Sequence, residues 1–321
     1  MLFEIKDLKV DFNTFRGKLE AVRGVSFSIP AGSITGIVGE SGSGKSVTAL
    51  SLINLLPKNS QAHGDILFQG ESIFGFDQEK LRSFRGKQVG VIFQEPGRSF
   101  DPIYSIGKSM AEAILAHQPE LKPEEAAEKA LKLLKEVNLP SAEERLKNFP
   151  HQFSGGLLQR IMIAVSLASD PELLIADEPT TALDVTIQAQ IVELLLSLKK
   201  KRNLAILFIS HNLALIGSVA ERIIVMYGGL IMEEGPAQEV LNRPLHPYTK
   251  GLLDSLPRFG SHYSEQPLRS IPGDVPNPLK PEPGCPFAPR CWLVKEECRK
   301  EIPPFITESH IHRCIIPGVK K

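Results

Sequence analysis

The chain has 321 residues, 42% of them apolar, and its 37 lysines and arginines balance 37 aspartates and glutamates. This length and composition are enough for a large buried core and argue against disorder. With no net charge, the chain shows no overall field that would attract nucleic acid or an anionic membrane surface. No apolar run approaches the roughly 20 residues that span a bilayer, and the N-terminus lacks the features of a signal peptide. We therefore expect a cytoplasmic protein.

Apolar segments with strand character alternate with helical stretches along the chain. Residues 2–38 predict short strands, and buried strands are expected at 89–93, 173–176 and 205–209. Between about 95 and 168 strand signals are missing, and the run that begins at Pro123 predicts an amphipathic helix. The pattern predicts an α/β fold with a largely parallel sheet and an inserted helical subdomain.

Residues 39–46, with the sequence Gly-Glu-Ser-Gly-Ser-Gly-Lys-Ser, fit a phosphate-binding loop between a strand and a helix. The glycines let backbone N–H groups surround phosphate oxygens, Lys45 reaches the terminal phosphates, and the Ser46 hydroxyl can ligate Mg²⁺. The other nucleotide contacts predicted here are Gly39, Ser41, Gly42, Gly44 and Val47.

A phosphate loop needs an acidic partner at the end of another strand, and Asp177 and Glu178 follow the apolar run 173–176. Asp177 is predicted to hold Mg²⁺, mostly through water. Glu178 is predicted to orient or deprotonate the attacking water. The alternative for Glu178 is a carboxylate that caps the next helix.

Residues 153–160, Phe-Ser-Gly-Gly-Leu-Leu-Gln-Arg, resemble the signature motif of the ABC ATPases. Gln94, Asp184 and His211 stand, in order, where this family has its other landmarks. The resemblance implies the ABC ATPase fold: a phosphate-loop core, an antiparallel β-subdomain and an inserted α-helical subdomain. Here a small irregular extension that contains cysteines follows, so we expect an ATPase domain at 1–240, with helices at about 95–168, and an extension at 241–321.

The resemblance also implies roles for these residues. Gln94 senses Mg²⁺ and the attacking water, and His211 contacts the γ-phosphate. Ser154 and Gly156 bind the γ-phosphate of ATP held by the opposite subunit of a head-to-tail dimer, and Asp184 communicates across that dimer.

An aromatic residue near the N-terminus stacks on adenine in this family. We favour Phe15 for this role, with Val22 packing against the ring. The alternative is that Phe12 and Phe15 both fill the core of the β-subdomain.

The loop 94–107 resembles that of oligopeptide and dipeptide importers, in which this region meets the permease. Residues 100–106 are therefore candidates for docking contacts, because apolar and aromatic anchors dominate interfaces. The alternative is a loop that folds over its own domain.

All four cysteines, Cys285, Cys291, Cys298 and Cys314, lie in a proline-rich tail that resembles the extension of the same importers. Four thiolates suit a [4Fe–4S] cluster or zinc, and the lack of paired C-x₂-C spacing favours the cluster. Free or paired thiols are the remaining alternative, and His310 or His312 could substitute as ligands.

The sequence thus predicts the ATP- and Mg²⁺-dependent motor of a peptide importer at the cytoplasmic face of the membrane. Its expected partners are a homologous ATPase in a hetero- or homodimer, two permease subunits and, indirectly, an extracytoplasmic binding protein. The alternatives are the same motor serving nickel chelate or oligosaccharide uptake, and a soluble ABC ATPase that acts on nucleic acid or the ribosome. No nucleic-acid partner is expected, because the chain shows no basic face.

Overall fold

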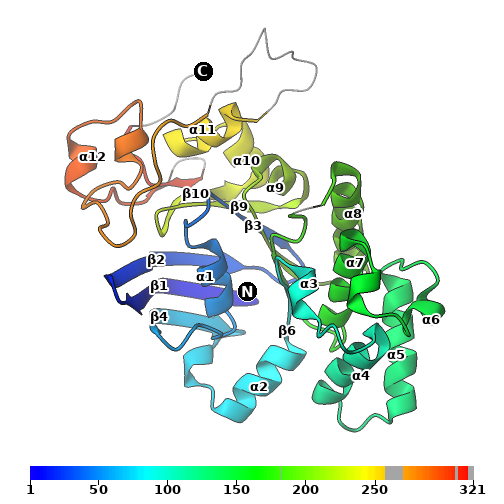
Figure 1. Ribbon diagram of the computed structural model, residues 1–321. Coiled ribbons are helices and arrows are strands. Elements are labelled where there is room, and N and C mark those ends of the chain that lie inside the picture. Colours follow the sequence, from blue (N-terminus) through cyan, green and yellow to red (C-terminus); the bar gives the residue numbers. More distant parts are fainter. Residues whose placement is uncertain (182, 257–269, 308–309, 317–321) are drawn as a thin grey trace. The chain divides into compact units, whose positions relative to one another are not determined.

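The computed structural model describes residues 1–181, 183–256, 270–307 and 310–316 (Figure 1). The chain forms two compact units, the first made of residues 1–29, 34–74 and 208–321, and the second of residues 30–33 and 75–207. Strand β8 (Ala205–Ser210) leads from the second unit into the first.

The first unit contains an antiparallel sheet in the order β2-β1-β4-β5. Its strands are β1 (Phe3–Thr14), β2 (Gly17–Ile29), β4 (Ser60–Phe68) and β5 (Glu71–Ser72). In β1 the buried residues Phe3, Ile5, Leu8 and Val10 are separated by more exposed positions. This alternation is expected of a strand with one face against a core, and Figure 1 shows the sheet in blue beside α1 (Lys45–Ser51).

A second group of strands in this unit carries the phosphate loop. Strand β3 (Ile34–Val38) is buried throughout and pairs in parallel with β9 (Arg222–Tyr227). Strand β10 (Leu230–Pro236) is antiparallel to β9, and the order continues through β12 (Ile311–His312) to β11 (Ile306–Thr307). The helices of this unit are α1, α9 (Leu213–Val219), α10 (Ala237–Asn242), α11 (Pro247–Asp254), η3 (Ala288–Arg290) and α12 (Glu297–Lys300).

The second unit is mainly helical. Its strands β6 (Val89–Ile92) and β7 (Leu173–Asp177) pair in parallel. The helices are α2 (Gln78–Lys87), α3 (Pro96–Ser99), α4 (Ile106–His117), α5 (Pro123–Glu136), α6 (Ala142–Arg145), η2 (Pro150–Gln152), α7 (Gly155–Ser166) and α8 (Val185–Arg202). The turn η1 (Ile73–Gly75) lies where the first unit gives way to the second.

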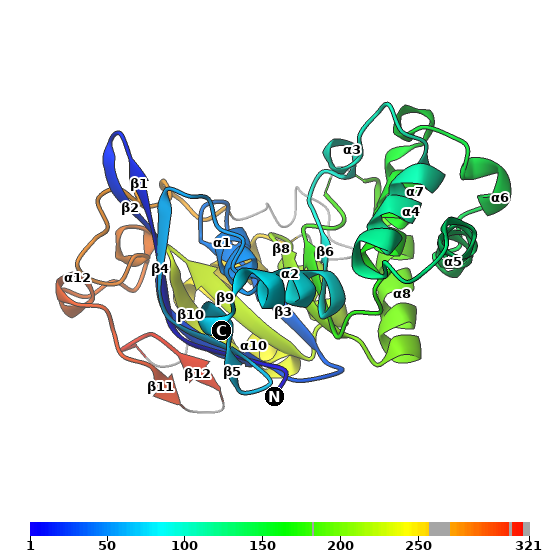
Figure 2. The ribbon, with the colours of Figure 1, turned by 90° about the horizontal axis from the view of Figure 1, so that it is seen from below.

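Helix α5 shows why this region is helical. Proline occupies its first turn, two glutamates follow at the positive end of the helix dipole, and Ala126, Ala130, Leu133 and Leu134 form a buried stripe. In Figure 2, α4, α5 and α7 lie together, in agreement with their contacts. Helices α3 to α7 thus occupy the range 96–166, inside the interval in which the sequence shows no strand signals.

The predicted α/β architecture is therefore confirmed. The expected boundary at residue 240 does not separate compact units, because the described residues of the extension fall in the same unit as the phosphate loop. Among the described residues, no helix combines the length and apolar character that a membrane crossing requires.

Candidate functional site

The phosphate loop follows β3 and ends at the start of α1. Gly42 and Gly44 have φ angles of +77° and +98°, which side chains other than glycine rarely adopt. At Gly39 an added Cβ would collide with the carbonyl oxygen of Met226. Glycine is therefore required here both for the turn and for close packing of the loop on β9.

Lys45 lies folded back against this loop. Its side chain is buried, and Nζ donates hydrogen bonds to the carbonyl oxygens of Gly39 and Glu40 at 2.8 and 2.9 Å. Ser41, Gly42 and Ser46 are exposed. Part of the loop is thus open to solvent, and Lys45 is held by hydrogen bonds to two of the loop's own carbonyl groups.

The second unit contains a separate cluster around Glu178. Its Oε2 accepts hydrogen bonds from Gln94 Nε2 at 3.0 Å and from Thr181 Oγ1 at 2.8 Å. Asp177, the last residue of β7, precedes it and is half-buried. Sequence reasoning assigned no role to Thr181, although it lies in a family motif and carries a hydroxyl three residues after the carboxylate.

The alternative role for Glu178, capping the next helix, is wrong in this structure. The cap of α8 is Asp184, whose side chain accepts the N–H of Ile187 at 2.9 Å. Glu178 instead has a φ of +48°, in the left-handed region. Such a conformation in a residue other than glycine costs on the order of 1–3 kcal/mol and is common at functional sites.

The signature residues lie at the start of α7. Ser154 is the N-cap residue and is exposed, but its side chain makes no capping hydrogen bond. An added Cβ on Gly156 would lie 2.6 Å from a methyl carbon of Ile187. The start of α7 therefore packs closely on α8 at Gly156. The exposed Ser154 hydroxyl is not used to cap the helix. His211 is exposed directly after β8.

Phe15, the favoured adenine contact, and Val22, expected to pack against the ring, differ sharply in exposure. Phe15 is 94% exposed in the turn between β1 and β2, so the alternative that it fills the core is wrong. Val22 is fully buried, and a Cβ on Gly44 would lie 3.5 Å from its side chain. Val22 supports the phosphate loop from within and presents no surface to a ring in this structure.

The predicted docking segment 100–106 is only partly exposed. Phe100 and Ile106 are buried, because Ile106 opens the apolar face of α4 and Phe100 turns inward. Ile103 is 70% exposed. The alternative of a loop folded over its own domain therefore holds for Phe100 and Ile106, and Ile103 remains an exposed apolar candidate for docking.

The four cysteines line one small cavity in the first unit, together with His246, Phe287 and Arg313. Burial raises the pKa of Cys285 to about 12 and that of Cys314 to about 11, which favours neutral thiols. Within the described residues, no group of three or more His, Cys, Asp or Glu side chains is arranged to hold a metal ion. The four thiols thus share one cavity, but in this conformation they are not arranged around a metal position, so the predicted metal or iron–sulfur site is not shown.

The histidine alternative is also unsupported. His310 Nε2 is 2.6 Å from the Glu233 carboxylate, so it is engaged in a buried pair. His312 is fully buried in β12, and neither of its ring nitrogens has a hydrogen-bond partner in the described part of the chain. Neither histidine lines the cysteine cavity.

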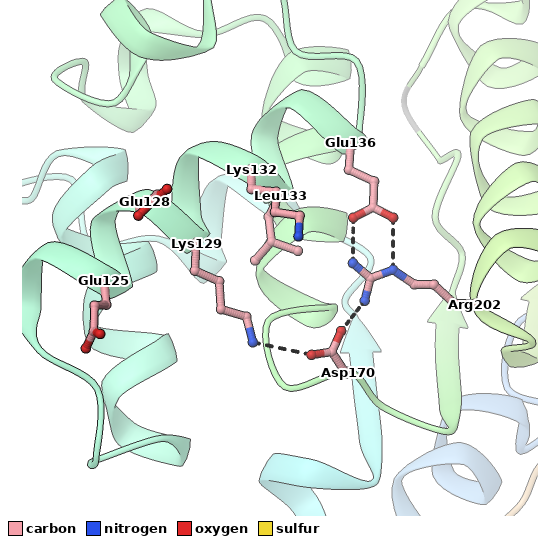
Figure 3. A pocket seen from close by; sticks show the side chains of 8 residues that line it. All are labelled: Glu125, Glu128, Lys129, Lys132, Leu133, Glu136, Asp170 and Arg202. Carbon is pink, nitrogen blue, oxygen red and sulfur yellow. Dashed lines mark hydrogen bonds and ion pairs between the residues drawn. The ribbon is translucent and has the colours of Figure 1, made fainter.

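A larger cavity of about 410 Å³ lies in the second unit (Figure 3). Arg202 forms ion pairs there with both Glu136 and Asp170, and Asp170 also pairs with Lys129. The hydrogen bond from Arg202 lowers the pKa of Glu136. None of the lining residues is a predicted site residue, and these pairs tie α5 to the end of α8.

Comparisons with known proteins point to one family. Residues 22–181 match the family model described as ABC transporter, and residues 232–298 match the model of the oligopeptide/dipeptide transporter C-terminal region. The chain is 44% identical to the oligopeptide transport ATP-binding protein OppD of Bacillus subtilis, over 96% of this chain and 87% of that protein. It is also 44% identical to the dipeptide transport ATP-binding protein DppD of Lactococcus lactis subsp. cremoris, over 97% and 89% of the two chains.

Solved structures show the same fold. A dimeric post-hydrolysis state of the ATP-binding cassette MJ0796, bound to ADP and Pi, is 25% identical with a TM-score of 0.65. The match covers 73% of this chain and 98% of that one. CbiO1 from Clostridium perfringens gives the same TM-score and identity over 75% and 90% of the two chains.

Proposed function

The chain belongs to the ABC transporter family of ATP-binding proteins, and from this premise we propose that it hydrolyses ATP to drive import of di- or oligopeptides. The assignment of peptides as the cargo rests on how much of the chain matches proteins named for peptide transport. Two proteins named for oligopeptide and dipeptide transport match at least 96% of this chain. Residues 232–298, which include much of the extension, match the C-terminal family model.

For the ATP site we propose that the phosphate loop and the Glu178 cluster act on the same nucleotide. Lys45 would leave its carbonyl partners for the terminal phosphates, and Ser46 and Asp177 would hold Mg²⁺ with Gln94. Their hydroxyl, carboxylate and amide oxygens suit this hard cation. His211 would contact the γ-phosphate, and Phe15 would stack on adenine, a role that its exposure supports.

Glu178 is the proposed base. The hydrogen bonds from Gln94 and Thr181 fix Oε2, so the carboxylate is oriented before water arrives. Gln94 is thereby tied to the residue that would deprotonate the water. A positioned base of this kind contributes about 10²–10⁴-fold in rate.

We further propose a head-to-tail dimer with a homologous ATPase. Ser154 and Gly156 of one subunit would bind the γ-phosphate of ATP on the other, and Asp184 would lie at the interface. The exposed start of α7, with the Ser154 hydroxyl not used as a cap, supports this role. Closing and opening of this dimer would move two permease subunits at the cytoplasmic face of the membrane, fed by an extracytoplasmic binding protein.

Ile103 is the proposed docking anchor for a permease subunit. Replacing it with aspartate is expected to weaken binding to the permease about 30-fold, because a charge would replace an interface anchor of about 2 kcal/mol. Co-purification with the permease subunits and titration of the ATPase into permease vesicles measure this effect. Val275→Asp, at another exposed apolar side chain, is the control, and equal weakening in both variants contradicts the assignment.

We also propose that the four cysteines bind metal, with a [4Fe–4S] cluster favoured over zinc. The support is the donor set: four thiols around one cavity, in a spacing without paired C-x₂-C motifs. Since burial raises the pKa of Cys285 and Cys314, metal binding would have to release protons from these two thiols, and loading is expected to improve as pH rises.

Metal analysis of anaerobically purified protein tests this assignment. Iron and sulfide near four per chain, lost in Cys291→Ser, is the expected result. Stoichiometric zinc would replace the cluster, and the absence of bound metal would overturn the assignment while leaving the ATPase untouched.

Transport itself is tested in vesicles that contain this chain, its partner ATPase and the permease subunits, supplied with the binding protein. ATP-dependent uptake of a labelled tripeptide is expected. Uptake of a nickel chelate or an oligosaccharide in its place would correct the cargo, and the same motor would remain. Tight nucleic-acid binding that survives moderate salt would favour the soluble alternative.

A further inference from the structure

Every polar group of Glu40, the second residue of the phosphate loop, is engaged. Its carboxylate accepts two hydrogen bonds from the Arg290 guanidinium, at 2.6 and 3.2 Å. Its N–H donates to the Tyr248 hydroxyl at 2.9 Å. Its carbonyl oxygen accepts from Lys45 Nζ and from the N–H of Ser43. Arg290 and Tyr248, both in the extension after residue 240, therefore hold the loop from outside it.

Arg290 is itself fixed in one orientation. Beyond Glu40, its guanidinium donates to the carbonyl oxygens of Ile271 and Pro272 and to the Tyr227 hydroxyl, at 3.1, 2.9 and 3.0 Å. Its side chain is only 6% exposed. The planar guanidinium, held by these hydrogen bonds, can donate to both oxygens of a carboxylate at once. A lysine ammonium cannot reproduce that geometry.

An aromatic cluster underlies this contact. Tyr227 at the end of β9, Tyr248 in α11 and Phe287 are each fully buried, and their ring centroids lie 4.5–5.4 Å apart. Phe287 lies between Cys285 and Arg290 in the sequence. The cysteine-bearing segment is thus packed against the strand beside the phosphate loop, and this packing sets the position of Arg290.

We propose that Arg290 is a positioning residue for nucleotide binding, acting through Glu40, so that the folded state of the cysteine-bearing extension sets the affinity of the phosphate loop. The proposal rests on the ATP site described above. If Lys45 turns to the terminal phosphates as proposed above, the loop loses the two hydrogen bonds from Lys45 Nζ to the carbonyl oxygens of Gly39 and Glu40. The contacts from Arg290 and Tyr248 remain, and they keep the loop in its binding conformation.

The test is the Kd for Mg·ATP, measured by calorimetry on the purified full chain. Arg290→Gln and Glu40→Gln are each expected to raise Kd about tenfold, the scale of one hydrogen bond to a charged group. The double variant is expected to be no worse than either single variant, because both changes remove the same contact. Arg290→Lys, which keeps the charge and loses the fork, is expected to recover part of the affinity.

Arg313→Gln is the matched control. Arg313 also lies in the extension and donates to the carbonyl oxygens of Ile231 and Pro303, and among the described residues none of its hydrogen bonds reaches the phosphate loop. As long as the extension stays folded, Arg313→Gln should lower stability without changing Kd, and thermal unfolding of every variant shows whether the protein is folded at the temperature of the binding measurement. A wild-type Kd in Arg290→Gln, or equal losses in Arg313→Gln, overturns the inference.

The control for the function itself is separate. Lys45→Ala is expected to abolish tight binding whether or not Arg290 positions the loop. If wild-type protein binds Mg·ATP and Lys45→Ala does not, a failure of the Arg290 variants counts against this inference alone. If wild-type protein binds no ATP, the proposed function fails.

Discussion

Replacing Glu178 with glutamine is expected to slow ATP hydrolysis by about 10²–10⁴-fold while ATP binding is retained. Glutamine keeps the size of the side chain, and its amide oxygen can still accept the hydrogen bonds from Gln94 and Thr181 that Oε2 accepts here. What it loses is the ability to take a proton from water. Turnover and the Kd for Mg·ATP, measured on the same preparation, separate the two effects.

The variant should also accumulate as an ATP-bound dimer, because in the proposed cycle hydrolysis is the step that lets the two ATPase subunits separate. Size-exclusion chromatography with and without Mg·ATP measures this. Glu193→Gln, at an exposed glutamate on α8, is the control and should behave as wild type. Wild-type turnover in Glu178→Gln would show that another group activates the water.

Where the main candidate motifs lie in the fold could be predicted from the sequence, because each motif is local. The glycines of the phosphate loop, Lys45 and Ser46 lie in one strand–turn–helix segment. Because they are close in the sequence, the local backbone conformation places them close together in the structure. The same holds for Asp177 and Glu178 at the end of β7. The geometry of such short motifs can therefore be inferred from the sequence alone.

Burial of individual side chains was less predictable. Phe100, Ile103 and Ile106 look alike as candidates for a docking surface, yet only Ile103 is largely exposed. The difference depends on the register of α4, whose buried face begins at Ile106. Val22 is buried for a similar reason, since strand alternation in β2 directs it to the core.

The contact between Arg290 and Glu40 was beyond sequence reasoning for another reason. It joins residues 250 positions apart, and neither belongs to a motif that names the other. Proline density in the tail predicted irregular structure, but which arginine among many would reach the phosphate loop depends on how α11 and the aromatic cluster fold together. The same limit applies to Glu233 and His310, which are 77 positions apart.

Replacing Glu233 with leucine is expected to destabilise the protein by about 3–5 kcal/mol, because it leaves several buried hydrogen-bonding groups without a partner, at about 1–3 kcal/mol each. Glu233 is fully buried in β10, and its carboxylate accepts the N–H groups of Leu245 and His246 as well as pairing with His310. Leucine would leave all three partners buried without an acceptor. Urea unfolding followed by circular dichroism measures the change.

The location of the loss is as informative as its size. Residues 245–246 lie near the start of the extension and His310 lies near its end, so the Glu233 carboxylate joins both parts of the extension to β10. Hydrogen exchange in Glu233→Leu should therefore increase first in α11 and β12, before it increases in β3. Glu143→Gln, which removes an exposed partner of Lys135, should leave both stability and exchange near wild type. Uniform loss of protection throughout the first unit would contradict this expectation. It would mean that the extension and the strands beside the phosphate loop unfold together, in one cooperative step.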